Sequence, residues 1–227
     1  LELADAATQS GAEIRYGAEV FELLSNGSRV TGVRLDNGEC LYADAVIVNA
    51  DPAAVAGGLF GDAGQAAVKP MPRRMRSLSA VTWAMVARTS GFPLSRHNVF
   101  FSNDYHAEFD DIFLRRRTPA EPTVYVCAQD RDGEGGIAAP DDGRERLFCL
   151  INAPADGDSR EPRRDAKWSN PPEIARCHDR MARRLAACGL TLTADPTSTA
   201  VTTPLGFETM FPGTGGALYG MASHGWM

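Results

Sequence analysis

The chain has 227 residues, of which 44% are hydrophobic and 23% are charged, and its formal net charge is −6. These values are ordinary for a globular protein, and the acidic balance argues against a general nucleic-acid binder, which would need a basic face. The five cysteines form no CxxC pair and the four histidines show no metal-ligand spacing. We therefore expect reduced thiols, a cytoplasmic location and no metal site.

The two ends of the sequence look like the interior of a longer protein. The first residue is a leucine, and Leu1–Ser10 has the composition of the end of a helix that Gly11 closes. The last residues, Ser223–Met227, contain neither a helix signal nor a polar tail. We expect the chain to be an interior piece.

The segment Glu19–Pro52 predicts a β-meander followed by a return strand. Asn26-Gly27 and Asn37-Gly38 supply residues that accept positive φ, as tight hairpin turns require. Ala45–Val48 is an unbroken apolar run, typical of a strand that is covered on both faces in a parallel sheet.

Polar residues follow this expected strand, where open α/β sheets place ligands. Asn49 and Asp51 could therefore bind a ligand, or Asp51-Pro52 could cap the helix expected at Pro52–Phe60. Spacing alone leaves both alternatives open.

The middle of the chain predicts an antiparallel sheet, because apolar residues alternate along strands separated by turns. In Leu78–Arg88, one face carries Val81, Trp83, Met85 and Ala87. The strands that we expect are Leu78–Arg88, Asn98–Phe101, Thr123–Ala128, Arg146–Asn152 and Leu192–Val201.

Three helices are expected between and after these strands. Asp104–Leu114 has apolar side chains at helical spacing, and Pro204–Met210 is short. The clearest helix begins at Asn170, which would cap it together with Glu173 in a capping box. Its apolar stripe consists of Ile174, Cys177, Met181, Leu185 and Cys188, and Gly189 ends it.

Few patterns point to chemistry. Gly213–Gly216 lacks the Lys-Ser/Thr of a phosphate loop, so it is either a plain turn or a close backbone approach to a flat ligand. His224 is either a functional polar group or a histidine with a purely structural role. The basic clusters Arg73–Arg76 and Arg115–Arg117 form a solvated face or attract anionic lipid.

Three stretches of the sequence resemble the phytoene desaturase family of FAD-dependent carotenoid enzymes. They are EIRYGAEV, RVTGVRLDNGECLYADAVIVNADP and TTPLGFETMFPGTGGALYG. The block RSLSAVTWAMVA and the segments after it look more like one branch, the hydroxyneurosporene and methoxyneurosporene desaturases. Members of that branch introduce the 3,4 double bond into 1-hydroxy- or 1-methoxy-carotenoids of purple bacteria.

The resemblance implies a mixed α/β fragment of a two-domain, Rossmann-like flavoprotein whose substrate domain has an antiparallel sheet. Residues 1–60 would belong to the FAD-binding domain, 61–200 to the substrate domain, and 201–227 would return toward the FAD-binding domain. The family's N-terminal GxGxxG and C-terminal Gly-rich motif are missing from the sequence. We therefore expect the piece alone to bind FAD poorly and to be inactive.

The resemblance also implies which residues approach the cofactor. Val20, Asn49, Ala50 and Asp51 would contact the adenine, ribose and diphosphate of FAD, and Gly215, Gly216 and Tyr219 would lie near the flavin ring and substrate. The catalytic residues stay unknown. The aromatic and methionine residues that would line a polyene tunnel, or form an ordinary core, are Trp83, Met85, Phe100, Phe101, Tyr105, Phe109 and Phe113.

Three functions remain in competition. The first is a 3,4-desaturase whose substrate is a carotenoid. Peripheral association of such an enzyme with the inner photosynthetic membrane is an open alternative to a purely cytoplasmic location. The second is a phytoene desaturase or carotenoid isomerase of the same family. The third is a carotenoid- or lipid-binding protein without redox activity.

Overall fold

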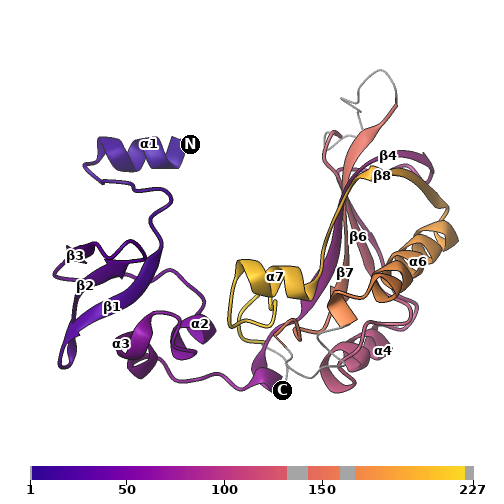
Figure 1. The fold of residues 1–227 in the computed structure, drawn as a ribbon. Helices are drawn as coiled ribbons and strands as arrows, with labels where there is room; N and C mark the ends of the chain where they lie inside the picture. Colours follow the sequence, from indigo (N-terminus) through magenta and orange to yellow (C-terminus); the bar gives the residue numbers. More distant parts are fainter. Residues whose placement is uncertain (1, 132–142, 159–166, 223–227) are drawn as a thin grey trace. The chain divides into compact units, whose positions relative to one another are not determined.

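The computed structural model describes residues 2–131, 143–158 and 167–222. The chain forms two compact units, Leu1–Pro70 and Met71–Met227. Both combine helices with antiparallel sheets, so the expected mixed α/β class is confirmed (Figure 1). Residues 61–67, which follow the boundary that the sequence led us to expect at 60/61, form a helix that packs on the first strand. The assignment of residues 1–60, 61–200 and 201–227 to FAD and substrate binding stays a prediction.

The first unit is built around the predicted β-meander. Its three strands pair antiparallel in the order β1-β2-β3. Gly27 and Gly38 have φ values of 68° and 87°, which confirms the expected role of the two glycines, whereas Asn26 and Asn37 do not take positive φ. The elements of this unit are α1 (Glu2–Gln9), β1 (Val20–Asn26), β2 (Arg29–Leu35), β3 (Cys40–Tyr42), α2 (Pro52–Ala56) and α3 (Gly61–Ala67).

The return strand expected at Ala45–Val48 is not present in the structure. These residues are irregular, and Ile47 is 95% exposed. A strand needs a neighbour for its backbone N–H and C=O groups, and the three-stranded sheet contains only β1, β2 and β3. The helix expected at Pro52–Phe60 is also shorter, because it ends before Gly57-Gly58.

The second unit contains a five-stranded antiparallel sheet in the order β5-β6-β7-β4-β8, which confirms the predicted strands. The long strand β4 pairs with β7 on one edge and β8 on the other. The strands are β4 (Ser79–Gly91), β5 (His97–Phe100), β6 (Val124–Ala128), β7 (Glu145–Ala153) and β8 (Leu190–Thr202). The helices are a 3₁₀ turn (Arg73–Met75), α4 (Tyr105–Phe109), a π-helical turn (Asp110–Leu114), α6 (Pro171–Ala187) and α7 (Pro204–Met210).

The side-chain caps predicted for the helices are present at α4 but not at α6. Asp104 accepts a hydrogen bond from the amide of Ala107, so it caps α4 as expected. At α6, Pro171 follows Asn170 as predicted, but the side chain of Asn170 makes no capping bond. Glu173 instead accepts hydrogen bonds from Thr118 and Arg176, so the predicted capping box is wrong.

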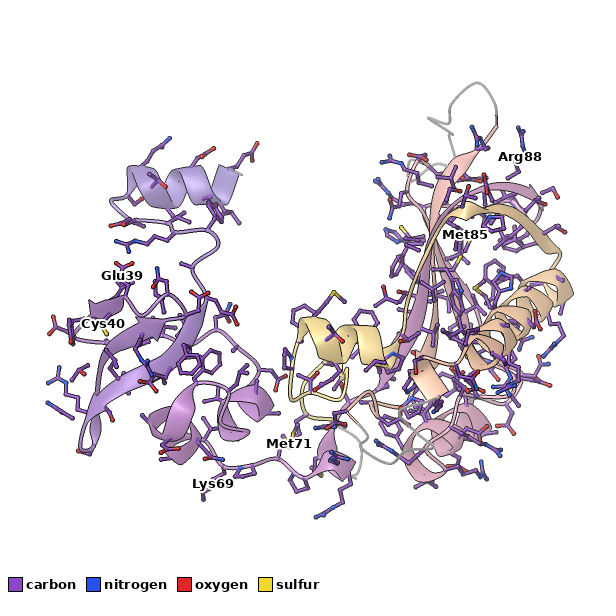
Figure 2. The ribbon with its side chains drawn as sticks, in the orientation of Figure 1. Glu39, Cys40, Lys69, Met71, Met85 and Arg88 are labelled. Carbon is purple, nitrogen blue, oxygen red and sulfur yellow. The ribbon has the colours of Figure 1, made fainter. Side chains whose placement is uncertain are left out.

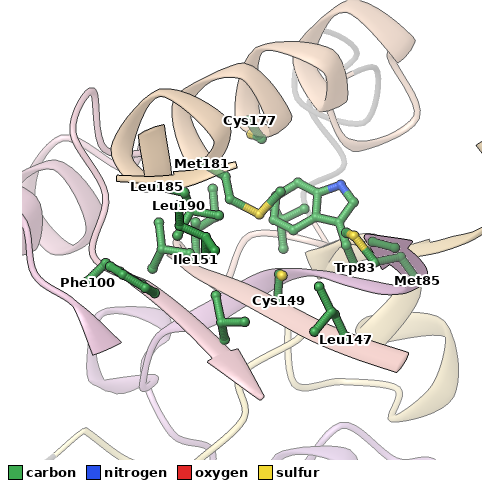
Figure 3. Close-up of a cluster of buried hydrophobic side chains, with 14 of the residues drawn as sticks. Trp83, Met85, Phe100, Leu147, Cys149, Ile151, Cys177, Met181, Leu185 and Leu190 are labelled. Carbon is green, nitrogen blue, oxygen red and sulfur yellow. The ribbon is translucent and has the colours of Figure 1, made fainter. Parts of the chain in front are cut away.

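The core lies between α6 and one face of the five-stranded sheet, here called the inner face. Trp83 and Met85 of β4 meet Met181 and Leu185 of α6 in one cluster (Figure 3), and the four are at most 4% exposed. The stripe predicted for α6 therefore buries its central residues, while Cys188 packs at the margin.

An ion pair between buried Arg76 and half-buried Asp158 anchors the entrance to β4. The guanidinium of Arg76, whose side chain is 8% exposed, donates from two nitrogens to the two carboxylate oxygens of Asp158, at 2.8 and 2.9 Å. Burial alone would raise the pKa of Asp158, but the hydrogen bonds and charge of Arg76, with the charge of Arg73, hold it below its usual value. The ionised carboxylate thus stabilises the fold.

Replacing Leu147 by alanine tests the inner face. Leu147 is 1% exposed and Leu114 is 74% exposed. We expect Leu147→Ala to lower the free energy of unfolding by about 2–5 kcal/mol, because it leaves a cavity in the core. Leu114→Ala makes the same chemical change at the surface and should stay within about 0.5 kcal/mol of wild type. Urea-induced unfolding measures both, and equal losses would contradict the assigned core.

Replacing Asp158 by asparagine tests this ion pair. At pH 7 we expect Asp158→Asn to lower the free energy of unfolding by roughly 1.5–3 kcal/mol, the range for hydrogen bonds to charged groups. Because the folded-state pKa is depressed, the contribution of Asp158 is present above its unfolded pKa of about 3.9 and is lost as the pH falls through the folded value. The difference between variant and wild type should therefore shrink below about pH 4. Thermal unfolding across pH, with exposed Asp36→Asn as the control, measures this.

Candidate functional site

The four positions expected to contact FAD lie in the first unit. Val20 begins β1 and pairs with Leu35 of β2. Asn49 is exposed and Ala50 is half-buried, directly before α2. Asp51 caps α2, since its Oδ1 accepts a hydrogen bond of 2.7 Å from the amide of Ala53. The capping alternative for Asp51 is confirmed, and the contacts of all four residues with FAD stay a prediction.

The Gly-rich loop Gly213–Gly216 is held by Glu208 of α7. The two carboxylate oxygens of Glu208 accept hydrogen bonds from the amides of Gly213 and Gly215, at 2.8 and 2.7 Å. A Cβ on Gly215 would lie 2.2 Å from a guanidinium nitrogen of Arg76, and one on Gly216 would lie 2.3 Å from the carbonyl oxygen of Pro204. The backbone of the loop therefore approaches other parts of the protein at these two glycines.

The segment after the loop runs beside the entrance to β4. The amide of Leu218 donates to the carbonyl of Leu78, and the amide of Tyr219 donates to the hydroxyl of Ser77. The side chain of Tyr219 is nevertheless 73% exposed. Of the three residues expected near the flavin, Gly215 and Gly216 are buried and Tyr219 offers an accessible aromatic ring. Their proximity to a ligand stays a prediction.

The face of the five-stranded sheet opposite α6, here called the outer face, carries two uncharged rows of side chains. Polar and charged residues usually alternate with core residues on such a face, but several of the side chains here are apolar. Phe148 and Leu150 of β7 are half-buried, and Val99 of β5 is 49% exposed. In strand register, the rows are Val99–Tyr125–Leu150–Thr82–Thr202 and His97–Cys127–Phe148–Ala84–Ala200.

The outer face extends across all five strands of the sheet. Five strands spaced about 4.8 Å apart are about 19 Å wide. The ten residues of the two rows contain no lysine, arginine, aspartate or glutamate. The sequence already carried a signal for this face that we missed: Leu147–Ile151 is apolar at every position, which indicates a strand with two apolar faces.

A second apolar surface is a groove of about 870 Å³ between α6 and β8. Ala182 and Ala186 of α6 form one wall, Leu192 and Val201 of β8 form the other, and Trp83 lies at the bottom. His178, Asp179, Thr191, Thr193 and Thr199 supply its polar lining. The groove could also accommodate an apolar ligand.

The structure separates the seven residues that we considered for a polyene tunnel. Trp83, Met85 and Phe100 are at most 5% exposed and belong to the core, as the alternative predicted, although the first two also reach the groove. Phe101 is 64% exposed, and Tyr105 is 54% exposed. Tyr105, Phe109 and Phe113 stand in a row along α4 and the π-helical turn, with ring centroids 4.7 and 6.0 Å apart.

The remaining polar candidates do not converge on a reactive centre. Among the described residues, no group of histidine, cysteine and carboxylate side chains could hold a metal ion, and His224 lies outside them. All five cysteines are free thiols, of which Cys40 on β3 is exposed (Figure 2) and Cys149 is buried, which raises its pKa to about 12. In the basic clusters, Arg73 pairs with Asp158, and Arg115 and Arg117 pair with Asp111.

Curated relatives of this chain are carotenoid desaturases. The hydroxyneurosporene desaturase of Rubrivivax gelatinosus is 50% identical over 97% of the chain, and that of Cereibacter sphaeroides is 42% identical over 99%. The zeta-carotene-forming phytoene desaturase of Myxococcus xanthus is 34% identical over 78%. The chain spans 40%, 42% and 32% of these proteins, respectively.

Other comparisons add little. No family model matches the chain. A solved oxidoreductase from Methanosarcina mazei aligns with 88% of this chain and 40% of its own at 15% identity, but its TM-score of 0.46 is too low to bear on function. Among the described residues, no helix has the length and hydrophobicity needed to cross a bilayer. On the sequence identities, the chain belongs to the carotenoid desaturase family that includes the hydroxyneurosporene and phytoene desaturases.

Proposed function

We propose that this chain forms part of an FAD-dependent oxidoreductase that introduces the 3,4 double bond into a 1-hydroxy- or 1-methoxy-carotenoid, such as hydroxyneurosporene. The observation that carries the proposal is the 50% identity to a hydroxyneurosporene desaturase, which extends over 97% of the chain. Identity falls to 34% over 78% of the chain for a phytoene desaturase. That difference favours the 3,4-desaturating branch over phytoene desaturation or isomerisation.

Each unit, taken by itself, offers accessible residues as candidate contacts for FAD. Asn49 and Ala50 are accessible before the N-terminus of α2, where they could contact the ribose and diphosphate. The exposed ring of Tyr219 could contact the flavin. When bound, FAD supplies the acceptor for a hydride from an allylic carbon, and a proton leaves the neighbouring carbon.

The outer face fits the carotenoid. A conjugated polyene is long and apolar, and the two rows extend across β5, β6, β7, β4 and β8 without lysine, arginine, aspartate or glutamate. The half-buried aromatic rings of Tyr125 and Phe148 offer flat apolar contacts. Because such a substrate dissolves in lipid rather than in water, we also infer contact with the periphery of a membrane.

Conversion of hydroxyneurosporene by the full-length protein tests the proposed reaction. We expect a product that has lost two hydrogen atoms and absorbs at longer wavelength, because the conjugated system grows. Removal of FAD should abolish conversion, and adding FAD back should restore it. Chromatography with mass spectrometry measures the product. Conversion of phytoene but not of hydroxyneurosporene would support the alternative branch, and binding without conversion would support a carrier.

Three alanine-to-phenylalanine variants locate the carotenoid. Ala84 lies on the outer face, Ala186 lines the groove, and Ala187 is exposed on α6 outside the groove lining. We expect Ala84→Phe to lower kcat/KM by about tenfold or more, because its ring occupies the surface on which the polyene rests. Ala187→Phe should stay within about twofold of wild type, which controls for added bulk. A loss confined to Ala186→Phe would instead place the substrate in the groove.

A further inference from the structure

We propose that Arg76, together with Asp158 and Glu208, is a positioning residue that fixes the Gly-rich loop and thereby presents Tyr219 to the flavin. The inference rests on the proposed function for the identity of the ligand. The hydrogen bonds on which it is based join protein residues of the second unit to one another, so they do not depend on that function. Arg76 itself is buried, so its role would be indirect.

Arg76 connects three segments that are distant in sequence. It binds both carboxylate oxygens of Asp158 and also donates to the carbonyl oxygen of Gly213, at 2.9 Å. Asp158 is 82 residues away and Gly213 is 137 residues away. A planar guanidinium can make all three bonds at once, whereas a lysine ammonium cannot reproduce this fork.

Glu208 holds the same loop through the amides of Gly213 and Gly215. The carbonyl of Gly213 is thus bound by Arg76 and its amide by Glu208. The amide of Gly157, next to Asp158, also donates to the carbonyl of Gly215, at 2.9 Å. The loop has little room to move while these bonds persist, and the absence of a Cβ at Gly215 admits the guanidinium.

The fixed loop sets the position of the residues that follow it. The backbone from Leu218 to Ala222 is bonded to the segment Met75–Leu78, which contains Arg76. Tyr219 is held by its amide while its side chain is exposed. A side chain that stacks on a ligand must be held close to its productive geometry, so loss of the clamp should affect the ligand.

Arg131 provides a matched control in the same unit. It binds both carboxylate oxygens of Glu145 and donates to the carbonyl oxygen of Leu94, and both side chains of the pair are at most 10% exposed. The pair also bonds Thr89, near the end of β4 that lies away from Arg76. Arg76→Lys and Arg131→Lys therefore make the same change in two comparable arginine–carboxylate pairs, with Asp158 16% and Glu145 4% exposed.

The experiment compares these two variants with wild type in the full-length protein. One readout is hydrogen exchange of residues 211–221, and the other is FAD affinity with the visible spectrum of the bound flavin. We expect Arg76→Lys to accelerate exchange, weaken FAD binding by about tenfold and alter the spectrum, because the loop loses its three-bond anchor. Arg131→Lys should leave all three within about twofold of wild type, even if it lowers the unfolding temperature.

The outcomes separate the two proposals. Equal flavin affinity and spectrum in wild type and Arg76→Lys would overturn the positioning role while leaving the flavoenzyme assignment in place. Equal effects of both variants would show that Arg76 contributes only to global stability and would also overturn it. A wild-type protein that binds no flavin would overturn the proposed function, and the role of Arg76 toward the flavin with it.

Discussion

The pairing of β4 on both of its edges is the constraint on which the second unit depends. β4 has 13 residues, of which Ser79–Ala87 pair with β7 and Thr82–Gly91 pair with β8, so every residue of the strand has a neighbour on at least one edge. This pairing fixes which side chains meet α6, because alternate residues must point to opposite faces. It also fixes the rows of the outer face, since the register is set by the same hydrogen bonds.

The two faces of the sheet have different roles in this arrangement. The inner face packs against α6 and supplies the core that stabilises the unit. The two rows of the outer face contain no lysine, arginine, aspartate or glutamate and, apart from buried Thr82, stay partly accessible, which makes this face a candidate ligand surface. The Arg76–Asp158 pair joins the start of β4 to the loop that carries Tyr219, so the sheet and the proposed cofactor contact share one anchor.

The errors of sequence interpretation have identifiable causes. Ala45–Val48 looked like a strand because its residues are apolar, but pairing with another strand decides whether such a segment is one, and no local pattern reports it. Glu173 occupies the sequence position that a capping box requires. In the folded chain, however, its carboxylate accepts hydrogen bonds from Thr118 and Arg176 instead. Arg76 was grouped with exposed arginines because its burial depends on a carboxylate 82 residues away.

The sequence by itself determined the meander, the five strands of the second unit, the stripe of α6 and the family. Turn chemistry and side-chain periodicity act between near neighbours, so they can be read from adjacent residues. Only the tertiary structure decided that Glu208 captures the amides of the Gly-rich loop and that Arg76 holds its carbonyl. Those bonds join residues from separate elements, and folding brings them together only after the sheet has set their positions.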